Sequence, residues 1–230
     1  MPFLDVNRRS LIAYRRAGFK KTVNCRLWRQ GFTLIELMIV ISLFGIAASL
    51  ITASYLNFEK NQRVQNAADK LKADLRLVQN KATSGDKGPG GLCPSTSSLG
   101  GWYLRVERNQ SLYSFGGVCL ASFSSESTFS VEVVNLPEGV KVNTISYTGT
   151  SSQSSPVAIF FRPLANDIKF HNASSALGAP VDFFETNGAL RNLLSPAPTS
   201  AVTIQLSDLG GTRLNNVVVD PSGEVKSFKP

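Results

Sequence analysis

The feature that most constrains this chain is an apolar run that extends from Phe32 to Leu56. Within this run Glu36 is the only charged side chain. At about 1.5 Å per residue, a helix of this length reaches roughly 37 Å, which exceeds a hydrocarbon thickness of about 30 Å. The run therefore predicts one transmembrane helix.

The net charge of +8 is distributed unevenly along the chain. Residues 1–30 carry eight basic and one acidic side chain, residues 57–84 carry a net +3, and residues 85–230 carry a net −1. Because basic flanks stay in the cytoplasm, this pattern predicts a single-pass membrane protein with a cytoplasmic N-terminus and a C-terminal domain on the other side of the membrane. The basic character of the chain thus indicates topology, and we expect no nucleic acid as a partner.

Three interpretations fit a basic flank followed by an apolar run. The first is a secretory signal peptide with its apolar core over Leu34–Ala48 and a small-residue cleavage site near Ser49. The second is an uncleaved single-span anchor. Both leave Glu36 unexplained, because a carboxylate within the hydrocarbon costs about 2.5 kcal/mol or more unless it has a partner.

The third interpretation accounts for the carboxylate. The stretch "GFTLIELMIVISLFGIAA" resembles the N-terminal motif of type IV prepilins and type II secretion pseudopilins. The resemblance implies that prepilin peptidase, a membrane aspartyl protease, cleaves between Gly31 and Phe32 and methylates the new amine of Phe32. Glu36 would then pair with the amine of a neighbouring subunit. Gly31 suits an extended backbone in a narrow protease cleft because it has no side chain.

The helical pattern continues beyond the apolar run. Apolar residues recur there at spacings of three and four, which is typical of an amphipathic helix: Val64, Ala67, Ala68, Leu71, Leu75, Val78 and Ala82. Glu59 with Arg63, and Lys70 with Asp74, are predicted to form i,i+4 pairs. The pattern ends at "TSGDKGPGG". We expect one helix over residues 32–84, transmembrane over 32–56 and amphipathic over 57–84.

Beyond the helix the hydrophobic period changes. Short β-branched and aromatic runs alternate with Gly, Pro, Asn and Ser clusters, which predicts an antiparallel β-domain over residues 85–230. The runs are "GWYLRVE", "SLYSF", "TFSVEVV", "VKVNTISY", "VAIFF", "DIKFHN", "VDFFE", "AVTIQL", "RLNNVVVD" and "GEVKSF". The predicted fold class is therefore α+β, with a long N-terminal helix packed on an antiparallel sheet.

A narrower resemblance concerns the outer domain. It is carried by "LCPS", the following "GW", "IFFRP" and the closing "RLNNVVVDPSGEVKSF". These segments are similar to the GspH/FimT family, which comprises the minor pseudopilin H of type II secretion and related minor pilins. The resemblance implies the type IV pilin fold, a cleaved leader over residues 1–31, and extraction from the membrane into a filament. Its implied partners are prepilin peptidase, other minor and major pilins or pseudopilins, the inner-membrane assembly platform and membrane lipid.

The three cysteines divide by compartment. Cys25 lies in the leader, in the reducing cytoplasm, whereas Cys93 and Cys119 lie outside the membrane. A disulfide between these two is expected, and it would stabilise the fold by roughly 3–4 kcal/mol. Two buried free thiols remain the alternative.

Catalytic signatures are missing from the sequence. His171 is the only histidine, with no Cys or acidic cluster at metal-ligand spacing, so it is expected on a strand face. Trp102 is expected in the core. No nucleophile elbow, zinc-protease or phosphate-loop sequence occurs. We expect neither an enzyme nor a bound cofactor or metal.

Two function classes follow from the family resemblance. The first is a structural subunit of a type II secretion pseudopilus or a type IV pilus that helps to initiate or cap filament assembly. The second is DNA capture in natural transformation, which relatives perform through an arginine-rich C-terminal region. Here that region, "DPSGEVKSFKP", offers Lys226 and Lys229 among acidic residues and has no arginine, so the binding class is disfavoured.

Overall fold

A computed structural model defines the fold. It describes residues 31–94, 96–122, 125–147, 155–164, 168–173, 182–185, 189–194 and 201–230. The chain divides into two compact units, residues 1–48 and 49–230, which are described separately. Apart from Gly31, the predicted leader over residues 1–31 lies outside the described part, as does Cys25.

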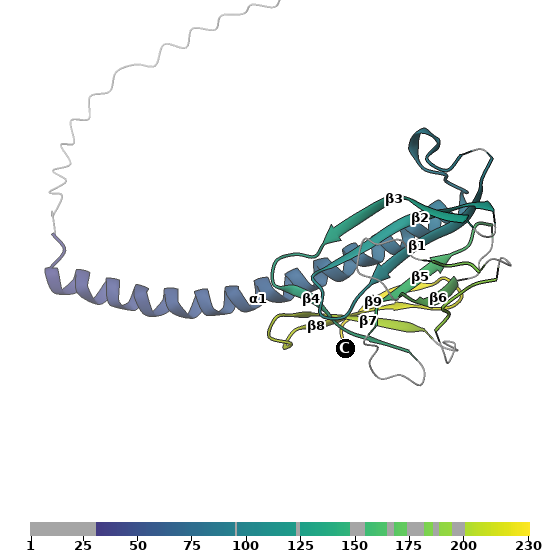
Figure 1. The fold of residues 1–230 in the computed structure, drawn as a ribbon. Helices are drawn as coiled ribbons and strands as arrows, with labels where there is room; N and C mark the ends of the chain where they lie inside the picture. Colours follow the sequence, from purple (N-terminus) through teal and green to yellow (C-terminus); the bar gives the residue numbers. More distant parts are fainter. Residues whose placement is uncertain are drawn as a thin grey trace, which may run out of the picture. The chain divides into compact units, whose positions relative to one another are not determined.

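One long helix, α1, extends over Leu34–Thr83 (Figure 1). Its C-terminal end is closed by Gly85, which adopts a positive φ of 69°. The N–H of Gly85 donates to the carbonyl of Ala82 at 3.1 Å, and the N–H of Asp86 donates to that of Lys81 at 2.9 Å. This pair of bonds is the Schellman termination, which favours glycine because the left-handed conformation carries no Cβ penalty there.

The amphipathic repeat of α1 forms the helix side of the core. Every apolar position predicted from the spacing is at most 2% exposed: Val64, Ala67, Ala68, Leu71, Leu75, Val78 and Ala82. The predicted pair of Arg63 with Glu59 is also present, at 2.6 Å. The predicted pair of Lys70 with Asp74 is wrong: no ion pair of the described residues joins them, and Asp74 accepts a hydrogen bond from Tyr113.

Nine strands follow within the described residues, after a short 3-10 helix η1 (Pro89–Gly91). They are β1 (Ser98–Val106), β2 (Leu112–Ser122), β3 (Ser125–Asn135), β4 (Val140–Ser146), β5 (Val157–Phe161), β6 (Ile168–Asn172), β7 (Val202–Asp208), β8 (Leu214–Val219) and β9 (Val225–Phe228). They form a five-stranded sheet in the order β3-β2-β1-β5-β6 and a four-stranded sheet in the order β4-β7-β8-β9. All pairings are antiparallel, so the predicted α+β class is confirmed.

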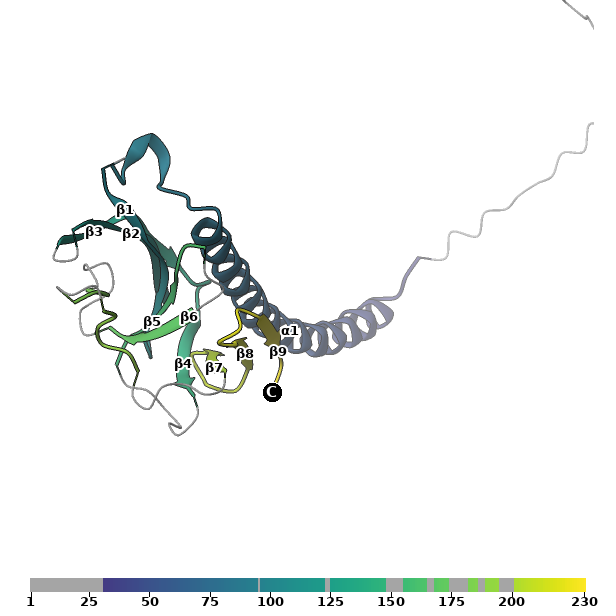
Figure 2. The ribbon, with the colours of Figure 1, turned by 90° about the vertical axis from the view of Figure 1, so that its right-hand side faces the viewer.

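Both sheets and the buried row of α1 share one hydrophobic core. The last strand, β9, lies beside α1 (Figure 2), where Arg76 Nη2 donates to the carbonyl of Val225 at 3.4 Å. A second, aromatic cluster contains Tyr103, Phe160 and Phe183. Because alternate residues of a strand point to opposite faces, the five-stranded sheet is covered on both sides.

Two strand predictions need correction. In the run "VDFFE", the described residues 182–185 form no strand, and Phe184 makes only an isolated bridge with Leu190. Strand β2 continues well beyond the predicted "SLYSF", through the Gly116–Gly117 pair. A Cβ at Gly117 would overlap the ring of Phe129 on β3, so this glycine permits close packing inside a strand instead of marking a turn.

Candidate functional site

The first turn of α1 begins with a local cap. The N–H of Glu36 donates to Thr33 Oγ1 at 3.3 Å, and the N–H of Leu37 donates to the carbonyl of Thr33 at 3.1 Å. Thr33 followed by Glu36 three residues later is the capping-box spacing, and an acidic residue here also suits the helix dipole. This role of Thr33 was missed from the sequence, although the spacing could have indicated it.

The carboxylate of Glu36 is exposed. Among the residues that the structure describes, no ion pair includes it. Phe32, four residues earlier, is 77% exposed. The first turn therefore presents a carboxylate that is available to a partner outside the chain.

The glycine ahead of this turn is not required by packing. A Cβ added to Gly31 would meet no atom within 4 Å, and the residue lies immediately outside the capped turn. The packing of the described fold therefore does not require glycine at position 31. The role predicted for Gly31 is recognition by another molecule, the protease.

The apolar half of α1 exposes large hydrophobic side chains on all sides. Its most apolar 18-residue window has a mean hydropathy of 2.5 with none of the window buried, so the helix is long and apolar enough to span a membrane. Leu34, Phe44 and Ile51 are 76%, 75% and 69% exposed. The hydroxyl of Ser42 bonds back to the carbonyl of Ile39 at 2.8 Å, which satisfies this polar group within the helix. A surface of this kind requires lipid or other apolar helices as its environment.

Comparison with known families matches this segment. Residues 29–52 fit the family model of the prokaryotic N-terminal methylation motif. The chain is type IV pilin-like. The second half of its long N-terminal helix packs on antiparallel sheets, which is the layout expected of such a protein. Neither the comparison with curated proteins nor that with solved structures found a significant match.

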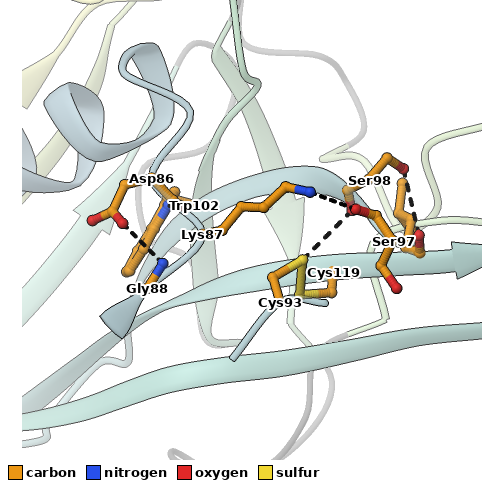
Figure 3. The surroundings of a disulfide bond; sticks show 9 residues. Asp86, Lys87, Gly88, Cys93, Ser97, Ser98, Trp102 and Cys119 are labelled. Carbon is orange, nitrogen blue, oxygen red and sulfur yellow. Dashed lines mark hydrogen bonds between the residues drawn. A yellow bond between two sulfur atoms is a disulfide. The ribbon is translucent and has the colours of Figure 1, made fainter. Parts of the chain in front are cut away.

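The pilin-like outer domain contains a disulfide between Cys93 and Cys119 (Figure 3). Their Cα atoms lie 5.6 Å apart, a normal separation for a disulfide, and both residues are 1% exposed. The bond links β2 to the connection between η1 and β1. Nearby, Lys87 Nζ donates to the carbonyl of Ser97 at 2.7 Å. The disulfide and this bond hold the connection that leads from α1 into the five-stranded sheet.

Trp102 belongs to the core, as expected. It is fully buried and packs edge-on against Phe129, with ring centroids 5.2 Å apart. Its Nε1 donates to the carbonyl of Asp86 at 2.8 Å, and Lys81 Nζ lies 4.4 Å from the ring centroid. The ring therefore anchors the end of α1 and offers no open face to a ligand.

His171 lies on β6 within the aromatic cluster and is 1% exposed. It packs edge-on against Phe160 and Phe183, with ring centroids 5.7 and 5.0 Å away. Its Nδ1 lies 2.6 Å from the carbonyl of Arg191, so this nitrogen carries the donated proton. Burial lowers the pKa of His171 to about 4, and the charge of Lys169 adds to the decrease. A neutral, enclosed imidazole of this kind serves packing.

Proposed function

We propose that this chain is a minor pilin or pseudopilin, a non-catalytic structural subunit that helps to initiate or cap a filament. The filament is either a type II secretion pseudopilus or a type IV pilus. The observation that carries the proposal is the exposed Glu36 carboxylate in the first turn of an exposed apolar helix, directly after the Gly31–Phe32 junction.

The proposed mechanism uses two charges that are each costly in an apolar environment. Hydrolysis after Gly31 would free a positively charged amine on Phe32, and this amine stays charged when the peptidase then methylates it in a separate step that uses a methyl donor. In a stack of subunits, this amine would meet the Glu36 carboxylate of its neighbour, and the two would neutralise one another. Before assembly, the helix would reside in the inner membrane, with the outer domain in the periplasm. Leaving one of the two charges unpaired in the filament core would cost several kcal/mol.

Within this class we favour the GspH/FimT family. The two-sheet outer domain and the motif residues around Cys93 and Trp102 support this assignment. DNA capture has weaker support. Lys226, one of the two C-terminal cations considered for phosphate binding, is ion-paired with Glu224 at 2.7 Å, and residues 85–230 carry a net charge of −1.

The processing step tests the proposal directly. Intact-mass measurement and N-terminal sequencing of the protein from native membranes should give a chain that starts at a methylated Phe32. A Gly31→Val variant should remain uncleaved yet fold normally, because the added side chain meets no neighbour in the described structure. A mature N-terminus near Ser49, or an intact leader in the native protein, would contradict the prepilin assignment.

A further inference from the structure

The outer unit contains a pocket of about 410 Å³ beside residues 60–63 of α1. Its other walls come from the connection between β3 and β4 and from the connection between β7 and β8. Charged residues of both signs line it, on different walls.

The wall formed by α1 is cationic. Lys60 and Arg63 line it, and Arg63 is held in place by Glu59 Oε1 at 2.6 Å and by the carbonyl of Glu138 at 3.2 Å. In the part of the chain that the structure describes, no ion pair within 4.0 Å includes Lys60. Lys60 thus acts on Asp208 through its charge without a direct ion pair, so its ammonium can still contact an anionic group.

The opposite walls contain two acidic residues, Glu138 in the connection between β3 and β4 and Asp208 at the end of β7. Asp208 Oδ1 accepts the N–H groups of Thr212 and Arg213 at 2.8 and 3.0 Å, and its Oδ2 accepts the hydroxyl of Thr212 at 3.0 Å. Burial acts to raise the pKa of Asp208, but these hydrogen bonds and the charge of Lys60 lower it overall. Asp208 thus stays ionised and fixed in orientation.

The pocket lies next to the end of the apolar run. Lys60 follows Leu56, the last residue of that run, by four residues, or about 6 Å along a helix. Around the end of the run, Tyr55 and Phe58 are 64% and 60% exposed, and aromatic residues at this position are typical of the membrane–water interface. At the pocket, Leu209 is 71% exposed. An apolar side chain beside cationic ones is suited to the headgroup layer.

We propose that this pocket binds the zwitterionic headgroup of a phosphoethanolamine lipid while Leu209 enters the interfacial layer. The lipid phosphate would contact Lys60 and Arg63, and its ammonium would contact Glu138 and Asp208. A headgroup with both charges matches two cations and two carboxylates, whereas an anionic headgroup leaves the carboxylates unmatched. A choline group has no N–H to donate to them. The proposal rests on the proposed function only in requiring that the apolar half of α1 lies in a bilayer.

Depth-dependent quenching tests the docking of the outer unit. The full chain would be reconstituted in phosphatidylethanolamine vesicles that contain brominated lipid, as a Leu209→Trp variant. Leu164→Trp is the matched control, because Leu164 is 91% exposed and lies just beyond Phe161, which pairs with Trp102 near the C-terminal end of α1. We expect brominated lipid to quench the tryptophan fluorescence of the Leu209→Trp variant more strongly than that of the Leu164→Trp variant. Equal quenching of the two variants would overturn the proposal.

Native mass spectrometry of the protein released from mixed-lipid nanodiscs tests the headgroup. We expect one retained phosphatidylethanolamine, and a loss of about fivefold in its occupancy in Lys60→Gln. Lys70→Gln, ten residues further along α1, should retain the lipid. Equal retention of phosphatidylcholine or phosphatidylglycerol would overturn the headgroup assignment. Extraction of the chain by carbonate would overturn the anchoring in the proposed function as well, whereas an embedded chain without the lipid adduct contradicts this inference alone.

Discussion

The hydroxyl of Tyr113 on β2 donates a hydrogen bond to Asp74 Oδ2 on α1, and so joins helix and sheet across the edge of the core. Tyr113 is fully buried. Burial of the phenol, together with its bond to Asp74, raises the pKa of Tyr113 well above its usual range. The phenol therefore remains protonated, and the bond persists, at any pH near neutrality.

We predict that Tyr113→Phe lowers the free energy of unfolding by about 1–3 kcal/mol, because it leaves the part-buried Asp74 carboxylate without this donor. Chemical denaturation of the outer domain would measure the change. A double-mutant cycle with Asp74→Ala isolates the bond from other effects of each substitution. If Tyr113→Phe costs as much in the Asp74→Ala background as in the native one, the hydrogen bond does not stabilise the fold.

The disulfide gives a second prediction. Replacing Cys93 and Cys119 with serine should lower the free energy of unfolding by about 3 kcal/mol, because the bond closes a loop with a sequence separation of 26. The free energy of unfolding of the variant should equal that of the native protein measured with reductant. Cys25→Ser should leave the stability of the mature chain unchanged. Alkylation of both outer thiols in folded, non-reduced protein would contradict the pairing.

For Glu36, we predict that Glu36→Gln leaves membrane insertion and cleavage intact but abolishes assembly. The substitution makes the apolar segment easier to insert, yet it leaves the amine of an adjacent subunit unpaired, at a cost of several kcal/mol. Co-purification with partner minor subunits after membrane extraction measures the loss.

The matched control for this experiment is Thr33→Ala. It removes the capping hydroxyl at about 1 kcal/mol of helix stability but retains the carboxylate, so assembly should survive. If Thr33→Ala impairs assembly as much as Glu36→Gln does, Glu36 acts through the helix cap and not through a neighbouring amine.

His171 makes stability depend on pH. Burial lowers its pKa from 6.5 to about 4 in the folded chain, so between these values the unfolded state binds the proton and the folded state does not. Stability should therefore fall as pH decreases from about 6.5 to about 4, by up to about 3 kcal/mol in total. Unfolding measured across this range should show the decrease, and His171→Gln should remove its contribution. If the stability of His171→Gln depends on pH as that of the native protein does, His171 is not the source of this dependence.

The helix was the most predictable part of the fold. The spacing of Val64, Leu71 and Leu75 extends over several turns, and a period of 3.6 is visible without any knowledge of what packs against it. All three side chains are buried as expected. The i,i+4 spacing of opposite charges also predicted the ion pair of Arg63 with Glu59, because residues at this spacing lie on one helix face.

Features that depend on distant residues were not predictable. The partner of Asp74 lies 39 residues away, so local spacing suggested Lys70 instead. The strand predicted at "SLYSF" ended before Gly117, because only the folded structure places the ring of Phe129 against this glycine. The pocket likewise required the fold, since Lys60 and Asp208 are far apart in sequence.

Because β9 lies beside α1, the fold is completed late in synthesis. Lys72 and Arg76 bond to Ser227 and Val225, which follow them by 155 and 149 residues. The apolar row of α1 is therefore synthesised long before the last strand that packs beside the helix. A chain that ends before β9 would leave this side of the helix without its partner strand.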